Sequence, residues 1–180
     1  MGTRTEHKVF LITGVHEYNL NRPLQVAMQK NLEIVGSPPF TEQDQVFGRA
    51  LQQYLEIEEK GYDGEIKPLA DEPEPASGGS TDVAEVSFIT PTVGLNVTTA
   101  ASDIPWHSWA TTACHGTEAG VKGAVVASKV LALTGLDLLM DTALLEEAKA
   151  FFEEKIGGKA YQSPIPQDQA PPLPKTVSER

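Results

Sequence analysis

A long apolar segment constrains the fold of this chain more than any other feature of the sequence. Residues 117–139 would place apolar side chains on nearly every side of a helix: Val121, Ala124, Val125, Val126, Val130, Leu131, Leu133, Leu136, Leu138 and Leu139. A helix of this kind is stable in water only when other elements cover several of its sides. We therefore expect it to be largely buried, and the remaining residues must supply the covering layers.

Three further segments have apolar residues at the spacing of a helix with one buried face. The first, residues 23–35, begins with proline, which suits the first turn of a helix. The second, residues 46–55, follows Thr41 and Asp44, which resemble a capping box. The third covers residues 144–152 and is stopped by a pair of glycines. We expect all three to pack their apolar faces on the core.

The remaining segments predict strands and loops. Short β-branched and apolar runs predict strands at residues 8–15, 83–90 and 91–99. The acidic, Pro- and Gly-rich segment 58–79 predicts an exposed loop, and the Pro-rich segment 159–180 predicts a loose tail. This mixture favours an α/β fold, with helices packed on a small mixed sheet. Two or three strands make a small sheet for four helices, so the helices are expected to need a larger one.

Charge and cysteine content narrow the class of protein. The formal net charge of −11 disfavours nucleic acid and anionic membranes as main partners, because both repel an acidic protein. No uninterrupted apolar run approaches the roughly 20 residues that span a bilayer, and no secretory signal precedes the first strand. A single cysteine, Cys114, excludes an internal disulfide. We expect a soluble cytoplasmic protein with no nucleic-acid and no membrane partner.

The most informative polar residue is His107. The chain has four histidines and two tryptophans, and both tryptophans flank this one histidine in the stretch PWHSW. On a loop before a buried helix, an imidazole is well placed for a binding or catalytic site. Alternatively, His107 belongs to a packed aromatic cluster in which its polar atoms have partners. Cys114 beside His115 suggests a nucleophile and base, but adjacent residues rarely turn their side chains toward each other.

A second candidate is the stretch SGGSTDVAEVSF, in which glycines lead into Ser80 and Asp82. Glycine allows close approach of the backbone to a ligand, and Ser or Asp can cap a helix. The stretch is therefore either a pocket wall or a simple loop and helix cap. Motifs for nucleotide binding, zinc-protease helices and serine-hydrolase elbows do not occur in the sequence.

Several stretches together resemble a known family. They are GSTDVAEVSFITPTVGLNVTT, PWHSW and GVKGAVVASKVLALTGLDLLMD, with YNLNRPL, NLEIVG and FTEQDQVFGRALQ upstream. Over roughly residues 5–156 the chain resembles the C-terminal part of the aminobenzoyl-glutamate hydrolase branch of the zinc-dependent amidohydrolases. That metallopeptidase family also includes aminoacylases, carboxypeptidase G and auxin-conjugate hydrolases.

The resemblance implies a domain organisation. Residues 1–20 would be the last strand of a lid and dimerisation domain with its crossover. Residues 21–158 would be the C-terminal half of a two-domain metallopeptidase-like catalytic domain, and residues 159–180 a Pro-rich tail. The missing N-terminal half would then supply the larger sheet that the helices need.

The resemblance also implies roles for four residues. His107 matches a histidine that ligates one metal of a two-metal site, with zinc or manganese as the metal. Ser80 and Asp82 match a segment that lines the substrate pocket, and Asn21 lies where the chain enters the cleft. The substrate would be an N-acyl amino acid or a dipeptide-like small molecule.

Departures from the family pattern affect the expected activity. The other metal ligands and the general-base glutamate come from motifs that do not occur here, and the family's Gly-His-Lys-Gly reads Gly120-Val121-Lys122-Gly123 in this chain. We therefore expect an amidohydrolase fragment that is inactive alone: a truncated product, a remnant, or one half of a split enzyme. Its partner would be an N-terminal half or a second copy in a homodimer. The alternatives are a non-catalytic interaction or assembly protein, and a small-ligand binder with a tryptophan-lined pocket.

Overall fold

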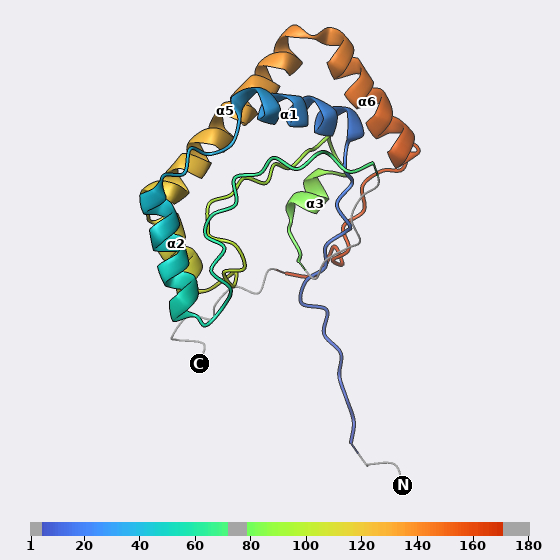
Figure 1. The fold of residues 1–180 in the computed structure, drawn as a ribbon. Coiled ribbons are helices and arrows are strands. Elements are labelled where there is room, and N and C mark those ends of the chain that lie inside the picture. The colour runs from blue at the N-terminus through green and yellow to red at the C-terminus, as the bar shows by residue number, and fades with distance from the viewer. Residues whose placement is uncertain (1–4, 72–78, 171–180) are drawn as a thin grey trace, which may run out of the picture.

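The chain folds into helices joined by long extended segments (Figure 1). The computed structural model describes residues 5–71 and 79–170. Its helices are α1 (Arg22–Val35), α2 (Glu42–Tyr54), α3 (Val83–Val86), α4 (Trp109–His115), α5 (Glu118–Met140) and α6 (Thr142–Ile156). The helices expected from apolar spacing are thus confirmed as α1, α2, α5 and α6.

Local capping explains where these helices begin and end. Asn21 caps α1, and its side chain accepts a hydrogen bond from a first-turn backbone amide. The predicted capping box of Thr41 and Asp44 is confirmed at the start of α2. Asp141 caps α6, whose C-terminal residue is followed by Gly157 in the left-handed conformation, with a φ of 61°.

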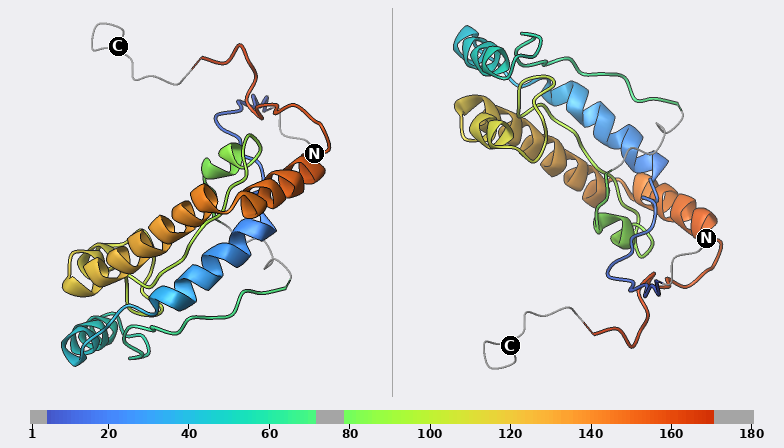
Figure 2. Two further views of the ribbon diagram at one scale, coloured as in Figure 1. Left: turned by 90° about the horizontal axis from the view of Figure 1, so that it is seen from above. Right: turned by 90° about the horizontal axis from the view of Figure 1, so that it is seen from below.

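Helix α5 is the central element, and α1, α4 and α6 all pack against it. Both views in Figure 2 show α1 lying alongside α5. One core cluster forms there, from Met28, Val126 and Val130. Next to it the buried Asn31 amide donates to Thr134 at 3.1 Å and to Asp137 at 2.7 Å, which fixes how α1 sits on α5. A second core cluster includes Ala119 at the start of α5. Its members are Leu51, Tyr62, Ala101, Ile104, Ala110, Cys114 and Ala119.

The prediction of an α/β fold with helices packed on a small mixed sheet is wrong. No strand forms among residues 5–71 and 79–170, and the backbone pairing between Leu20 and Thr92 is an isolated parallel bridge. Residues 83–86 form α3, while 8–15 and 91–99 run without neighbouring strands. A β-branched run becomes a strand only when another backbone lies alongside to share its hydrogen bonds. Here the alternating apolar residues of 91–99 pack against the helices instead.

The expectation that α5 is largely buried is also wrong. Its buried residues all lie on one face: Ala119, Gly120, Gly123, Val126, Val130 and Thr134. On the opposite face Val121, Val125, Leu136 and Leu139 are 57%, 47%, 48% and 85% exposed. We call these four residues the outer face of α5. The helix is apolar on two sides, and the described part of the chain covers one of them.

By length and composition alone α5 could also cross a membrane, contrary to the expectation from apolar runs. The same test is passed by core helices of water-soluble proteins. Polar contacts also join α5 to its neighbours in this fold. Lys122 forms an ion pair of 2.5 Å with Asp44 at the start of α2, and Asp137 accepts from Asn31 of α1.

The structure describes only part of the segments that the sequence predicts as an exposed loop and a Pro-rich tail. Residues 58–71 form no helix and are mostly exposed, although Gly61 and Tyr62 are buried. Residues 159–170 form no helix and are largely exposed as well. The remainder of the two segments, 72–78 and 171–180, lies outside the described residues.

Candidate functional site

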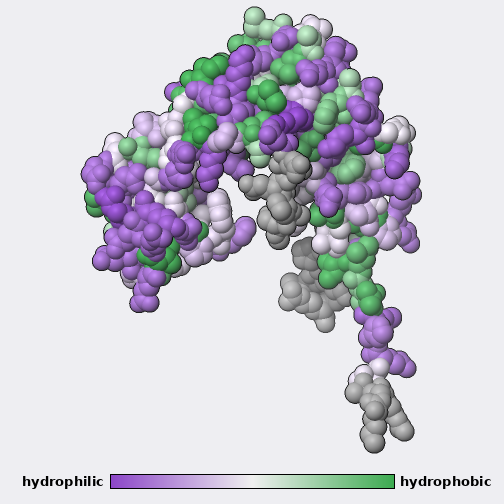
Figure 3. Space-filling view, turned by 45° about the vertical axis from the view of Figure 1, so that its right-hand side comes forward, coloured by the Kyte–Doolittle hydropathy of each residue, from purple (hydrophilic) through white to green (hydrophobic). Residues whose placement is uncertain are grey.

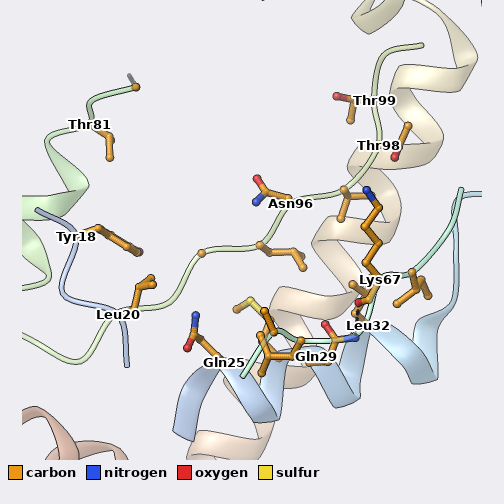
Figure 4. Close-up of a pocket in the computed structure, with 18 of the residues that line it drawn as sticks. Tyr18, Leu20, Gln25, Gln29, Leu32, Lys67, Thr81, Asn96, Thr98 and Thr99 are labelled. Carbon is orange, nitrogen blue, oxygen red and sulfur yellow. Dashed lines mark hydrogen bonds between the residues drawn. The ribbon is translucent and has the colours of Figure 1, made fainter. Parts of the chain in front are cut away.

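A wide groove lies beneath α1, with a volume of about 1890 Å³. One side is a face of α1 with both polar and apolar side chains, such as Gln25, Gln29 and Leu32, and the other is the extended segment 94–106 (Figure 4). Figure 3 shows the molecule hollowed beneath the helices, between the end that carries α2 and the N-terminal segment. Labelled residues in Figure 4 come from several elements: Tyr18, Leu20, Gln25, Gln29, Leu32, Lys67, Thr81, Asn96, Thr98 and Thr99.

The predicted pocket-lining stretch reaches the rim of this groove. Ser80 and Thr81 line it, and both are exposed. Asp82 is exposed at the start of α3 but does not line the groove, and its side chain makes no capping hydrogen bond. Thr81 instead accepts a hydrogen bond of 3.3 Å from the Val83 amide. The stretch thus combines a helix start with a groove wall, and Ser80 is better placed than Asp82 to meet a ligand in the groove.

His107 is exposed and has an unusual backbone conformation. Its φ of 58° lies in the left-handed region, which residues other than glycine adopt at a cost. Such residues concentrate at functional sites, where the surrounding structure holds them in place. Here Ser108 holds the turn, because its hydroxyl accepts from the Thr111 amide and donates to the Pro105 carbonyl at 2.6 Å. The imidazole has no hydrogen-bond partner among the described residues.

The flanking tryptophans do not form an aromatic cluster around His107. Trp109 meets Tyr54 of α2 edge to face, with ring centroids 5.7 Å apart. Trp106 lies near His115, at 6.3 Å, and is 73% exposed beside the groove. In the described structure, the alternative of a satisfied histidine in an aromatic cluster therefore does not form.

The neighbouring Cys114 and His115 are separated by their surroundings. Cys114 is completely buried in the core cluster, whereas His115 is exposed and its Nε2 lies 3.0 Å from the Thr99 hydroxyl. A buried thiol in an apolar core is not a reactive nucleophile. The structure gives no support to a cysteine–histidine pair.

Asn21 is a buried residue that links two helices. It is 2% exposed, and its amide donates to the Ala148 carbonyl of α6 at 2.8 Å. Its side-chain oxygen accepts from the Leu24 amide at 3.3 Å. Asn21 therefore joins the start of α1 to α6 and does not line the groove.

The described residues do not complete a metal site. No group of three or more His, Cys, Asp or Glu side chains comes together in the described part of the chain. A catalytic zinc site generally takes three protein ligands. His107, Ser80 and Asn21 lie next to different helices, and His107 forms no hydrogen bond or ion pair with a described carboxylate or imidazole. The described side chains therefore do not fit a two-metal site by themselves.

One polar cluster has no counterpart among the predicted sites. Glu85 of α3 accepts a hydrogen bond of 2.5 Å from the Tyr161 hydroxyl and one of 2.6 Å from the His16 amide. The His16 Nδ1 lies 3.0 Å from the same carboxylate. Tyr161 and then His16 lower the pKa of Glu85, and the carboxylate in turn raises the pKa of Tyr161. No sequence spacing indicates this cluster, because its members lie 69 and 76 positions apart.

Comparison with known proteins gives one relative by name. The chain is 26% identical over 178 residues to a protein of Escherichia coli (strain K12) that is named as a subunit of p-aminobenzoyl-glutamate hydrolase. The alignment covers 86% of this chain and 37% of that protein, so the chain spans little more than a third of the relative's length. No family model matches the chain. No solved structure matches it either.

This match supports the resemblance in its coarser form. The link to aminobenzoyl-glutamate hydrolases is supported by a named relative, while zinc and the link to aminoacylases and carboxypeptidase G stay predictions. The chain is thus a distant relative of a protein named as part of a hydrolase, which suggests a hydrolase-related function.

Proposed function

We propose that this chain contributes part of a metal-dependent amidohydrolase that cleaves the amide bond of an N-acyl amino acid similar to p-aminobenzoyl-glutamate. In this proposal His107 is one ligand of zinc or manganese, and Ser80 and Asp82 lie on the substrate side. The remaining ligands and the general base come from outside the chain, so the chain alone is inactive. Asn21 acts through the position of α1, because its own polar atoms are already bonded.

The observation that carries the proposal is the presentation of His107. Its backbone is in a strained left-handed conformation, and a hydrogen-bonded turn holds it there. Its imidazole has no partner among the described residues and is free to bind a metal. The hydrolase relative supports the reaction class, and its greater length supports a need for further residues.

The outer face of α5 supports a partner polypeptide. Four apolar side chains stand exposed along it, opposite the face that packs on α1. We propose that a polypeptide equivalent to the unmatched part of the relative covers this face and completes the site; a homodimer or a membrane surface are the other occupants to test. We also propose a cytoplasmic protein, and its net charge of −11 disfavours nucleic acid and anionic membranes as partners because both repel an acidic protein.

A second candidate function is a non-catalytic interaction or assembly protein of the same origin. It is favoured by the exposed outer face of α5 together with the lack of a three-ligand cluster in the described residues. Under this hypothesis the partner binds, but no hydrolysis follows and His107 is dispensable.

The two candidates are separated by a complementation experiment. The chain is mixed with the part of the Escherichia coli relative that it does not match, with manganese or zinc, and release of p-aminobenzoate is followed. The proposal predicts activity in the mixture and none in either part alone. His107→Ala should remove the activity, and His115→Ala is the matched control that should retain it. Equal activity of the His107→Ala mixture and the wild-type mixture would contradict the proposal.

A double substitution on the outer face tests the docking surface. Val125→Lys with Leu136→Lys should change the unfolding temperature little, because both side chains are about half exposed. It should nevertheless abolish binding of the complementary polypeptide, measured by size-exclusion chromatography with light scattering. Loss of a homodimer instead would identify self-association, and unchanged partner binding would exclude this face.

A further inference from the structure

A second, smaller cavity lies where three distant segments of the chain meet. In Figure 1 the segment before α1, the short α3 and the segment after α6 run together below the helices. The cavity between them has a volume of about 440 Å³. Eight residues line it: His16, Phe88, Lys155, Ile156, Lys159, Ala160, Tyr161 and Gln162. This volume falls within the usual range of about 300–1,000 Å³ for small-molecule sites.

Aromatic rings form one wall of the cavity. The rings of His16 and Phe88 lie 4.8 Å apart and are tilted by 41°. The Tyr161 ring meets His16 at 6.0 Å in an edge arrangement. The Glu85 carboxylate holds His16 and Tyr161 in place through the hydrogen bonds described above. Fixed rings of this kind favour a planar aromatic ligand, because it can stack or meet them edge-on.

The charged lining of the cavity is positive. Lys155 and Lys159 line it, and Glu85, the neighbouring carboxylate, does not. Both Glu85 oxygens already accept hydrogen bonds from His16 and Tyr161. Lys155 donates to the Leu20 carbonyl at 3.1 Å, which fixes its ammonium and leaves further protons to donate. Lys159 has no ion pair in the described part of the chain. The cavity thus has two cationic side chains, although the net charge of the whole protein is −11.

Together, the ring wall and the two ammonium groups match one ligand chemistry. A carboxylate attached to an aromatic ring would place its charge at the lysines and its ring against Phe88 and Tyr161. We propose that this cavity binds a small aromatic carboxylate. The cavity adjoins the wide groove, with which it shares His16 and Lys155. Binding here does not depend on the hydrolase-related function.

The experiment is a titration of the full chain with benzoate, followed by protein NMR. Benzamide lacks the negative charge and cyclohexanecarboxylate lacks the aromatic ring. Each should bind about tenfold more weakly, as expected when a charge-assisted hydrogen bond or an aromatic contact is lost. The resonances that shift should belong to His16, Phe88 and Tyr161. No detectable benzoate binding at millimolar concentration would overturn the proposal, and so would equal binding of benzoate and benzamide.

Paired variants test whether the ligand sits in this cavity. Lys159→Gln should weaken benzoate binding about tenfold, whereas Lys129→Gln on α5 should leave it unchanged. Phe88→Leu should weaken it, whereas Phe47→Leu, on the partly exposed side of α2, should not. Lys159 is exposed, so its substitution is not expected to affect folding, which circular dichroism checks. Benzoate binding that survives both Lys159→Gln and Phe88→Leu would overturn the proposal.

Discussion

His107 has a backbone conformation that glycine adopts freely and a β-branched residue adopts poorly. At the scale of single residues this makes the strain at His107 measurable. His107→Gly should leave the free energy of unfolding unchanged or raise it by up to about 1 kcal/mol, because strain is relieved while chain entropy is lost. His107→Val should lower it by about 1–2 kcal/mol. Urea unfolding measures both, and a Gly variant less stable than the Val variant would show that the left-handed conformation at this position is not a source of strain.

Asn21 is the clearest structural residue among the predicted site residues. Asn21→Ala removes a helix cap and a buried hydrogen bond to Ala148, so it should lower the free energy of unfolding by about 1–3 kcal/mol. Asn96→Ala is the control: Asn96 is exposed beside the groove, and its substitution should stay within about 0.5 kcal/mol. If thermal unfolding finds the two variants equally stable, Asn21 does not hold α1 on α6.

Single residues also show how far sequence reasoning reaches. The flanking tryptophans made His107 a candidate site residue, and the structure places it at the surface. The spacing of residues in the sequence does not predict which side chains lie near it. The partner of Asn21 lies 127 positions away, and only the packing of α6 brings the two together. For the same reason, the cluster of His16, Glu85 and Tyr161 was missed.

At the scale of elements, α5 depends on close contacts at its N-terminal end. A Cβ atom on Gly123 would lie 2.3 Å from the Thr98 carbonyl oxygen, and one on Gly120 would lie 2.6 Å from the His115 carbonyl oxygen. These glycines let the segment 98–99 and the end of α4 touch the helix. The motif Gly120-Val121-Lys122-Gly123 therefore has a packing reason in this chain, apart from any role of the family's histidine.

The two ends of α5 should respond oppositely to the same substitution. Gly123→Ala should destabilise the fold by about 1–3 kcal/mol, because backbone atoms must move. Gly135→Ala meets nothing within 4 Å and should stabilise it by about 0.5–1 kcal/mol through higher helix propensity. Thermal unfolding of the two variants gives the comparison. Stabilisation by Gly123→Ala would mean that the segment 98–99 does not lie against α5.

Elements differ in how well their sequences predict them. Helix ends were predictable because caps such as Thr41 with Asp44 act locally. The strand predictions failed because a strand depends on a second backbone alongside, which no local pattern reveals. The prediction that α5 is largely buried failed for a related reason. The apolar residues of α5 show that two faces need to be covered, but they do not show whether this chain covers both.

At the scale of the whole molecule, the ion pair between Asp44 and Lys122 joins α2 to α5. Burial alone would raise the pKa of Asp44, but hydrogen bonds from Lys122 and Thr41 outweigh it, and the pKa lies below its usual 3.8. A lowered folded-state pKa stabilises the protein above about pH 4 and loses this effect as pH falls through the folded pKa. Asp44→Asn should therefore show a weaker loss of stability below pH 4 than wild type in urea unfolding. Glu147→Gln, on the exposed side of α6, should behave as wild type; an unchanged acid profile for Asp44→Asn would show that the ion pair does not contribute.

The proposal for the molecule as a whole is that this chain supplies one metal ligand, His107, while its described residues do not complete the site. Titration calorimetry with zinc and with manganese, on the wild-type chain and on His107→Ala, tests it most directly. We predict weak binding in both proteins, with little difference between them. Tight binding that is lost in His107→Ala would contradict the account, because the chain would then supply the remaining ligands itself.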